Sequence, residues 1–279
     1  MRAMADIATS DWPFMKMHGA GNDFVVIDGR ITPVVLTEPL VRALADRHRG
    51  VGFDQLALIS DGDDLAVTFY NADGSKSAAC GNATRCIAAR ELAHSNVDTL
   101  NIDVTGRGTL QAVRTAKGGT AVNMGQPQLD WRDIPLAQDV DTLSLPIDGN
   151  PVATGMGNPH CTFFVDDVTA IDLADVGPMI EHHPLFPDRT NVQFAQVIGP
   201  SHIRMRVWER GTGITLASGS SSCATAVAAT RRGLTEHRVQ IDLDGGTLHI
   251  DWRDDGVWMS GPTAHVFDGR LTAEFLNSL

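Results

Sequence analysis

Short apolar runs separated by glycine and polar turns fill the first half of the chain, with two longer stretches of helical periodicity between them. Runs of this kind, bounded by turn residues, predict strands. We expect strands at residues 24–28, 50–59 (after an initial turn), 65–70, 99–104, 108–113 and 120–124. Helices are predicted over Thr37–His48, with Thr37 as the N-cap, and over Gly81–Ala93. The glycine-rich stretch Met17–Asp23 is interpreted as a loop.

The second half of the chain repeats much of this order. Met156–Asp166 resembles the early segment around Asn22, and Asn191–Val197 resembles the segment that starts at Phe53. A strand, a helix and three short strands then follow, at residues 204–208, 221–233, 238–243, 247–252 and 257–260. The common order indicates an internal duplication of two β-rich halves, each built around one long helix. The predicted fold class is therefore mixed α/β (α+β).

The length and one break in the pattern suggest where the halves divide. A chain of 279 residues is long for one small domain. The strand pattern stops around Gln126–Trp131, and residues 135–146 resemble a connection. We predict an N-terminal domain over residues 12–127 and a C-terminal domain over residues 128–266. The last residues, 267–279, are expected to cross back and complete the first domain.

One cassette occurs in both halves. Asn71 stands nine positions before Cys80-Gly81-Asn82, and Glu209 stands nine positions before Ser218-Gly219-Ser220. In both copies the polar residue follows a predicted strand, and a predicted helix follows the glycine. Two facing copies would place Cys80 and Ser218 on opposite sides of one cleft.

The start of a helix gives this cassette its chemistry. Unpaired N–H groups and the helix dipole favour a thiolate over a thiol, so we expect a lowered pKa for Cys80. The same N–H groups can hold a carboxylate, which suits an α-amino acid. Inverting its α-carbon requires one group that takes a proton and another that delivers one to the opposite face. Serine is too weak an acid for this task unless a separate base activates it. The alternative for Cys80 is a small buried core residue.

Composition excludes several classes of function. With 34 acidic and 22 basic residues the formal charge is −12, which argues against nucleic-acid binding. No apolar run is long enough to span a membrane, and the first eleven residues do not resemble a signal peptide. We therefore expect a cytoplasmic protein with reduced thiols.

No cofactor or metal is expected. The cysteines Cys80, Cys86, Cys161 and Cys223 form no C-x-x-C pair and no zinc-type spacing. Pyridoxal phosphate needs a Schiff-base lysine. Lys76 is the one lysine inside a cassette, and the equivalent position of the other copy is Ile214. Neither a P-loop nor a dinucleotide-binding glycine motif is present.

The motifs together resemble the diaminopimelate epimerase family. They are Met17-His-Gly-Ala-Gly-Asn-Asp-Phe, Gly52-Phe-Asp-Gln, Asn71-Ala-Asp-Gly-Ser, Cys80-Gly-Asn-x-x-Arg-Cys, Met156-Gly-Asn-Pro-His and Glu209-Arg-Gly-x-Gly. The resemblance extends from about Phe14 to the C-terminus. It implies two pseudo-symmetric domains, each a β-barrel-like sheet around a central helix, with the active site in the cleft between them. It also implies a homodimer that interconverts LL- and meso-diaminopimelate without pyridoxal phosphate, on the route to lysine and peptidoglycan.

The resemblance assigns roles to individual residues. Cys80 matches one catalytic cysteine, and Ser218 occupies the position of the other. His160 and Glu209 match positions that tune the acid–base pair. The residues that match the substrate-binding set are Asn22, Gln55, Asn71, Gly81, Asn82, Asn158, Asn191, Glu209, Arg210, Gly219 and Ser220.

Three positions depart from the family pattern. Ile214 stands where many members have glutamate, Ser221 where many have glycine, and Ser218 where the second cysteine is expected. The first interpretation is an epimerase that Ser218 impairs. The alternatives are a one-base dehydratase or lyase that acts on a related amino acid with Cys80 as its base, and a non-catalytic amino-acid-binding protein.

Overall fold

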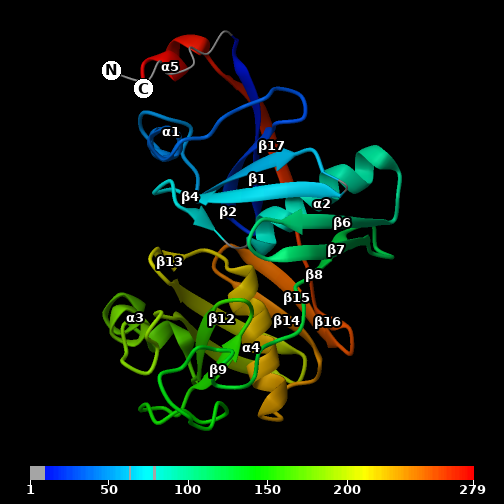
Figure 1. Cartoon of the computed structure of the whole chain (residues 1–279). Coiled ribbons are helices and arrows are strands. Elements are labelled where there is room, and N and C mark those ends of the chain that lie inside the picture. Colours follow the sequence, from blue (N-terminus) through cyan, green and yellow to red (C-terminus); the bar gives the residue numbers. More distant parts are fainter. Residues whose placement is uncertain (1–9, 63, 78–79) are drawn as a thin grey trace.

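A computed structural model of the chain describes residues 10–62, 64–77 and 80–279. The N-terminal residues 1–9, part of the segment judged not to be a signal peptide, lie outside the described residues. The described part has a mixed α/β fold in two halves that lie one above the other in Figure 1. Among these residues, no helix has the length and apolar composition that crossing a membrane requires.

The first half is a strongly curved set of strands with one helix packed along it. Its strands are β1 (Trp12–Gly19), β2 (Asn22–Asp28), β3 (Gln55–Ser60), β4 (Leu65–Asn71), β5 (Lys76–Ser77), β6 (Thr99–Val104), β7 (Gly108–Arg114) and β8 (Thr120–Asn123). Most neighbouring strands run antiparallel, whereas β2–β3 and β4–β6 are parallel pairs. The stretch Met17–Asp23, predicted as a glycine-rich loop, is instead the end of β1, a tight turn and the start of β2, because Ala20 and Gly21 alone carry the reversal with positive φ.

The second half repeats this pairing scheme strand for strand. Its strands are β9 (Val152–Gly155), β10 (Pro159–Phe164), β11 (Asn191–Gly199), β12 (His202–Glu209), β13 (Gly213–Thr215), β14 (Arg238–Leu243), β15 (Gly246–Arg253) and β16 (Gly256–Ser260). The parallel pairs are β10–β11 and β12–β14, in the same places as in the first half, and the other pairs are antiparallel. The duplication read from the sequence is therefore present in the sheet topology.

The register corrects one detail of that duplication. Gln55 lies opposite Phe24 across β2–β3, and Asn191 lies opposite His160 across β10–β11. Asn191 is therefore the counterpart of Gln55, whereas the sequence comparison had paired Asn191 with Phe53. The local match was misleading because both strands carry glutamine in similar apolar surroundings, and only hydrogen-bonded partners fix a register.

Two buried helices occupy equivalent places in the halves. Helix α2 (Gly81–Ser95) packs on β1, β2, β6, β7 and β8, and helix α4 (Gly219–Arg231) packs on β9, β10, β11, β14, β15 and β16. Both are buried over most of their length, so small residues and apolar side chains occur all round them instead of on one stripe. Helix α2 ends at Asn96, whose left-handed conformation is a common helix stop.

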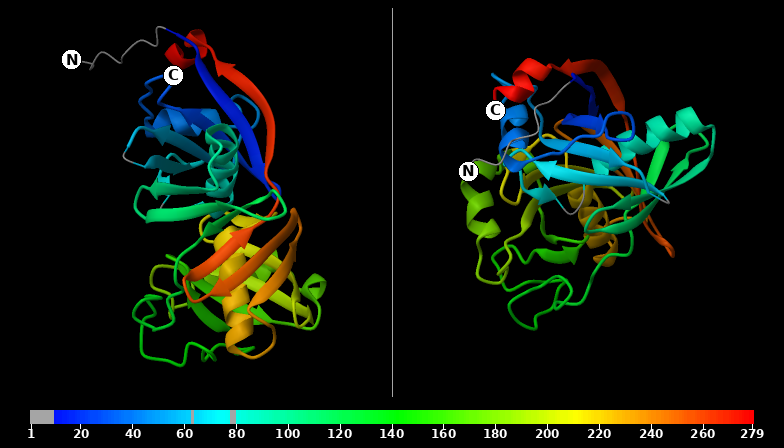
Figure 2. Two further views of the ribbon diagram at one scale, coloured as in Figure 1. Left: turned by 90° about the vertical axis from the view of Figure 1, so that its right-hand side faces the viewer. Right: turned by 45° about the horizontal axis from the view of Figure 1, so that its top comes forward.

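The starts of the two helices meet where the halves join. A Cβ added to Gly219 would lie 2.9 Å from Met259 Sδ and 3.6 Å from the backbone nitrogen of Asn82, which shows how closely the two helix starts approach each other. Strand β8 pairs with β16, and strand β17 (Ala264–Leu271) returns from the second half to pair with β1. Figure 2 shows β1 and β17 as long neighbouring strands along one side of the first half.

Shorter helices cover the outer surfaces. Helix α1 (Glu38–Ala45) begins at the predicted cap Thr37, whose side chain accepts from the backbone N–H of Leu40. Helix α3 (Leu173–Glu181), the 3₁₀ turn Val168–Ala170 and α5 (Ala273–Asn277) were not predicted. Three clusters of buried apolar residues hold these layers together, and the largest includes residues of both central helices.

Candidate active site

A cavity of about 650 Å³ lies where the two halves meet. Its walls come from β2, the segment before β3, β4 and the start of α2 on one side, and from β11, β12, β13 and the start of α4 on the other. Every residue predicted for the site except His160 lines this cavity. Local sequence places these residues at strand ends and helix starts, and the pairing of the two halves brings the sets together.

Cys80 and Ser218 are the N-cap residues of the two central helices and have nearly the same backbone conformation. Their φ/ψ values are −139°/97° and −135°/119°. Cys80 Sγ accepts a hydrogen bond from the backbone N–H of Ala83 at 3.5 Å, which is the N-cap interaction. Ser218 makes no side-chain cap hydrogen bond. The two cassettes are thus equivalent in backbone, and their side chains make different interactions.

The expected lowering of the Cys80 pKa is not found. Burial raises the pKa of the Cys80 thiol strongly, and the charge of Glu209 acts in the same direction. The N–H of Ala83 favours the thiolate, but it is the smaller effect. The prediction from the helix start was wrong for this cavity because desolvation of a buried thiolate outweighs one hydrogen bond.

The Ser218 hydroxyl lies between two oxygen partners. It is 2.9 Å from Glu209 Oε2 and 2.9 Å from Ser221 Oγ. The other carboxylate oxygen, Glu209 Oε1, accepts from the hydroxyl of Thr215 at 2.6 Å. Burial raises the pKa of Glu209 above its ordinary value, although the hydrogen bonds from Thr215 and Ser218 oppose this shift. A carboxyl group therefore stands where it can exchange a proton with Ser218.

His160 lies behind the cavity wall and is fully buried. Its Nε2 is 2.8 Å from Asn158 Oδ1, and its Nδ1 is 3.0 Å from the amide nitrogen of Gln193. Burial, together with the positive charges of Arg210 and Arg107, lowers the pKa of His160 to about 3. The imidazole is therefore neutral near pH 7 and reaches the cavity only through its neighbours.

A row of amides on the first-half wall has its orientation fixed at both ends. Arg85 Nη1 donates to Asn82 Oδ1 at 2.9 Å, and Asn82 Nδ2 donates to Asn22 Oδ1 at 3.3 Å. Asn22 Nδ2 in turn donates to Asp54 Oδ2 at 2.8 Å. Arginine can only donate and a carboxylate can only accept, so the amide groups have one consistent direction. The carbonyl oxygen of Asn22, inside this row, also accepts from Cys80 Sγ at 3.8 Å.

The remaining predicted side chains are held mainly by neighbouring protein groups. Gln55 Nε2 donates to Asn71 Oδ1 at 3.1 Å, which joins β3 and β4 at the cavity. Asn191 accepts from the backbone N–H of Arg210 at 3.0 Å and donates to the carbonyl of Pro159 at 3.0 Å. The exposed Arg210 side chain donates to the carbonyl of Asp188 at 2.9 Å. Asn191 is thus committed to backbone groups and positions Arg210.

Sequence reasoning missed several residues that shape the site. Arg85 and Asp54 occur inside the motifs described above, so their motif positions were a signal that could have found them. Thr215, Gln193 and Arg107 carry no local signal. The Arg107 guanidinium lines the cavity and donates to the carbonyls of Met124 and Met156, which joins the two halves.

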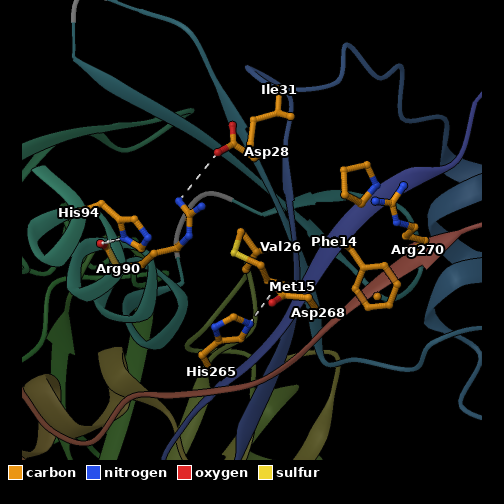
Figure 3. A pocket seen from close by; sticks show the side chains of 12 residues that line it. Phe14, Met15, Val26, Asp28, Ile31, Arg90, His94, His265, Asp268 and Arg270 are labelled. Carbon is orange, nitrogen blue, oxygen red and sulfur yellow. Dashed lines mark hydrogen bonds and ion pairs between the residues drawn. The ribbon is translucent and has the colours of Figure 1, made fainter.

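A second cavity of about 600 Å³ lies in the first half, between β1, β2, α2 and β17 (Figure 3). Asp28, Arg90, His94, His265 and Asp268, which line it, have partners within the protein. Arg90 Nη1 is 3.8 Å from Asp28 Oδ2, and His265 Nε2 is 3.0 Å from Asp268 Oδ1. His94 Nδ1 is 2.7 Å from the carbonyl oxygen of Arg90. None of the residues predicted for catalysis or substrate binding lines this cavity.

Comparisons with solved structures support the fold. The chain superposes on a hydroxyproline epimerase from Agrobacterium vitis with a TM-score of 0.67 and 12% identity, covering 95% of this chain and 93% of the other. A phenazine biosynthesis protein of the PhzF family from Bacillus anthracis gives a TM-score of 0.67 and 14% identity, covering 94% and 99%. At such identities the likeness concerns the fold alone.

Comparisons of sequence go further. The profile of the family described as diaminopimelate epimerase matches residues 14–129 and 152–266. The diaminopimelate epimerase of Rhodospirillum centenum is 52% identical over 272 residues, which cover 94% of this chain and 93% of that protein. The diaminopimelate epimerase of Acidiphilium cryptum is 53% identical over 273 residues, which cover 95% and 98%. The chain therefore belongs to the diaminopimelate epimerase family.

Proposed function

We propose that this protein interconverts LL- and meso-2,6-diaminopimelate by proton transfer at one α-carbon, without a cofactor. Family membership over nearly the whole chain supports this activity. The observation that carries the mechanism is the shared cavity, where the N-cap residues Cys80 and Ser218 of two equivalent helices both form part of the lining. Groups so arranged can reach a bound α-carbon from two sides.

The helix starts supply the charge stabilisation that such a reaction needs. In our proposal the reacting α-carboxylate lies against the N–H groups of Gly81, Asn82, Gly219 and Ser220, which also stabilise the carbanion when the α-proton leaves. Arg210 binds the distal carboxylate through charge-assisted hydrogen bonds. The amides of Asn22, Asn71 and Asn158, with Gln55, bind the remaining polar groups, and Asn191 supports Arg210.

Further properties are proposed on the same basis. We propose that residues 12–127 with 267–279 form one domain and residues 128–266 the other, each a β-barrel-like sheet around its central helix. The return of β17 onto β1 supports the assignment of the C-terminus to the first domain. A homodimer in the cytoplasm is the assembly and location that the family resemblance implies. Sedimentation velocity of the purified protein tests the dimer.

The experiment that tests the activity follows isomer composition and solvent deuterium together. Purified protein is incubated with LL- or meso-diaminopimelate in deuterium oxide. The isomers are then separated, and the deuterium content of each is measured by mass spectrometry. We expect inversion with incorporation of one deuteron, slower than in a Ser218→Cys variant because a hydroxyl is a much weaker acid than a thiol. Cys80→Ala should abolish inversion in both proteins.

Other outcomes would identify the alternatives. Absence of inversion in both the unmodified protein and the Ser218→Cys variant would refute the epimerase proposal. Loss of water from a hydroxylated amino acid, dependent on Cys80, would indicate a one-base dehydratase. Binding of diaminopimelate in calorimetry with no deuterium exchange would indicate a binding protein.

A further inference from the structure

The hydroxyl of Ser218 belongs to a connected row of polar groups inside the second half. The row runs from Glu209 through Ser218 and Ser221 to Gln193, with distances of 2.9, 2.9 and 3.0 Å. Ser221 is fully buried, and so is Gln193. Neither residue has a role in the proposed function, and Ser221 is one of the positions that depart from the family pattern.

The donors and acceptors in this row limit how its protons are arranged when Glu209 is ionised. The amide nitrogen of Gln193 only donates, and it lies 3.0 Å from both Ser221 Oγ and His160 Nδ1. Thr162 donates to the other end of the same amide, Gln193 Oε1, at 3.1 Å. Ser221 Oγ therefore accepts from Gln193, and it also accepts from the Ser218 hydroxyl at 2.9 Å, while its own proton can point to His160 Nδ1 at 3.5 Å. The one proton of Ser218 thus has two acceptors, Glu209 Oε2 and Ser221 Oγ.

His160 is not the titrating group at the far end of this row. Its Nδ1 accepts from Gln193, so its proton is on Nε2 and points to Asn158 Oδ1. Burial and the charges of Arg210 and Arg107 keep it neutral, with a pKa lowered to about 3. Glu209 is the carboxyl group in direct contact with Ser218. Besides Thr215 and Ser218, the group that acts on it is Asp54 of the opposite wall, whose negative charge favours the protonated form.

We propose that Ser218 relays a proton between the substrate α-carbon and Glu209, and that Ser221 and Gln193 hold this relay in line. The inference rests on the proposed epimerase function. It supplies the separate base that serine needs, and it makes Glu209 the second proton carrier of the reaction in place of a thiol.

Each transfer balances without an additional reactant. In one direction the Cys80 thiolate takes the α-proton, the Ser218 hydroxyl gives its proton to the opposite face of the carbanion, and Glu209 gives its carboxyl proton to Ser218 Oγ. The products are the Cys80 thiol, an intact Ser218 hydroxyl, the Glu209 carboxylate and the inverted substrate. The reverse direction starts from that form, and exchange with solvent restores the first form for another turnover.

Ser221 has a defined task in this relay. Ser221 holds Ser218 Oγ beside Glu209, because its hydroxyl oxygen accepts from the Ser218 hydroxyl and is itself held by the hydrogen bond from Gln193. When Glu209 is protonated and donates to Ser218 Oγ, the Ser218 proton can turn toward the substrate. A glycine at position 221 would remove this acceptor, and Ser221 lies one helical turn from Ser218, on the same face of α4. The two departures from the family pattern thus form one functional unit.

The test compares three substitutions in the unmodified protein and in the Ser218→Cys variant. Glu209→Gln removes the proton carrier, Ser221→Ala removes the aligning hydroxyl, and Ser222→Ala is the matched control. Ser222 is a buried serine of the same helix, but its hydroxyl donates to the carbonyl of Ser218 at 2.8 Å. Inversion of LL-diaminopimelate is measured for all proteins, with circular dichroism to show that each is folded.

In the unmodified protein we expect Glu209→Gln to lower the inversion rate about 100-fold or more, as for loss of a general acid–base group. Ser221→Ala should lower the rate about 10-fold or more, and Ser222→Ala less than about 3-fold. In the Ser218→Cys variant, whose thiol carries its own proton, Ser221→Ala should cost less than about 3-fold and Glu209→Gln less than about 10-fold.

The pH profile gives a readout that a merely structural role would not move. The active form carries one proton that is shared between Cys80 and the proton carrier on the opposite side of the substrate. The lowest pH at which the protein is active is therefore set by the more acidic of these two groups. That member is a carboxyl in the unmodified protein and a thiol in the Ser218→Cys variant. The unmodified protein should therefore keep its activity to lower pH than the variant does.

Two results would overturn the relay. Inversion by the Ser218→Cys variant with none by the unmodified protein would refute it, and would show an epimerase site that Ser218 inactivates. Equal losses from Ser221→Ala in both proteins, matched by Ser222→Ala, would show that Ser221 only packs the helix. Absence of inversion in every protein would instead mean that the proposed function itself fails.

Discussion

Replacing Cys161 by alanine should make the folded protein less sensitive to alkaline pH. Cys161 lies on β10 with no exposed surface, and burial raises the pKa of its thiol strongly from the ordinary value of 9.0. Below pH 9 the thiol is protonated in both the folded and the unfolded chain, so pH has no effect through it. Above pH 9 only the unfolded chain releases the proton, and stability is lost as the pH rises.

The magnitude follows from the shift. At pH 10 an unfolded thiol of pKa 9.0 is about ten-elevenths ionised, which favours unfolding by about 1.4 kcal/mol. Burial also raises the pKa of Cys86 to about 11 and that of Cys223 to about 12, and it raises the pKa of Cys80 further. The four thiols together should cost about 5–6 kcal/mol at pH 10, a large part of a typical folding free energy.

Urea unfolding under reducing conditions, followed by circular dichroism between pH 7 and pH 10, measures this effect. Cys161→Ala should be less stable than the parent by about 1 kcal/mol at pH 7, because it leaves a small cavity. At pH 10 the difference should shift by about 1.4 kcal/mol in favour of the variant, which then becomes at least as stable as the parent. Val192→Ala is the control, since Val192 faces Cys161 across β10–β11, is equally buried and does not titrate. A Cys161→Ala difference as independent of pH as that of Val192→Ala would refute the reasoning.

Three further predictions concern single side chains. His160→Gln should remove a loss of stability at acidic pH. The pKa of His160 is about 3 in the folded protein, below the ordinary 6.5, so only the unfolded chain gains a proton as the pH falls below 6.5. In the unmodified protein this proton lowers the free energy of unfolding by about 2 kcal/mol at pH 5. Urea unfolding at pH 7 and pH 5 checks this, and an unchanged acid slope in the variant contradicts it. Arg85→Met should change stability by less than about 2 kcal/mol, because removing a buried unpaired charge offsets the hydrogen bonds lost to Asn82 and Pro262. Its kcat/KM should nevertheless fall because the Asn82 amide loses its fixed direction, and wild-type kinetics would contradict this role. Arg210→Ala should raise KM about 10- to 100-fold with a smaller change in kcat if Arg210 binds the distal carboxylate. Steady-state kinetics decide this, and a fall in kcat alone would place Arg210 in the chemical step.

The comparison between sequence and structure is favourable for the duplicated elements. The helix predicted over Gly81–Ala93 is α2 at Gly81–Ser95, and the helix predicted over Ser221–Gly233 is α4 at Gly219–Arg231. These helices were recognised because their composition and boundaries are local properties. The end of strand β1, Met17–Gly19, was mistaken for a loop, since the sequence does not show its pairing with β17 more than 240 residues away.

The sequence by itself determined the duplication, the two cassettes and the family, because these are properties of residue order. It also fixed which side chains stand at the two helix starts. Only the tertiary structure decided the electrostatics of the site, since burial depends on what packs around each group. Burial reversed the expected pKa shift of Cys80 and neutralised His160. Folding also brought Glu209, Ser218 and Ser221 into one hydrogen-bonded row, which places a carboxyl group next to the serine hydroxyl.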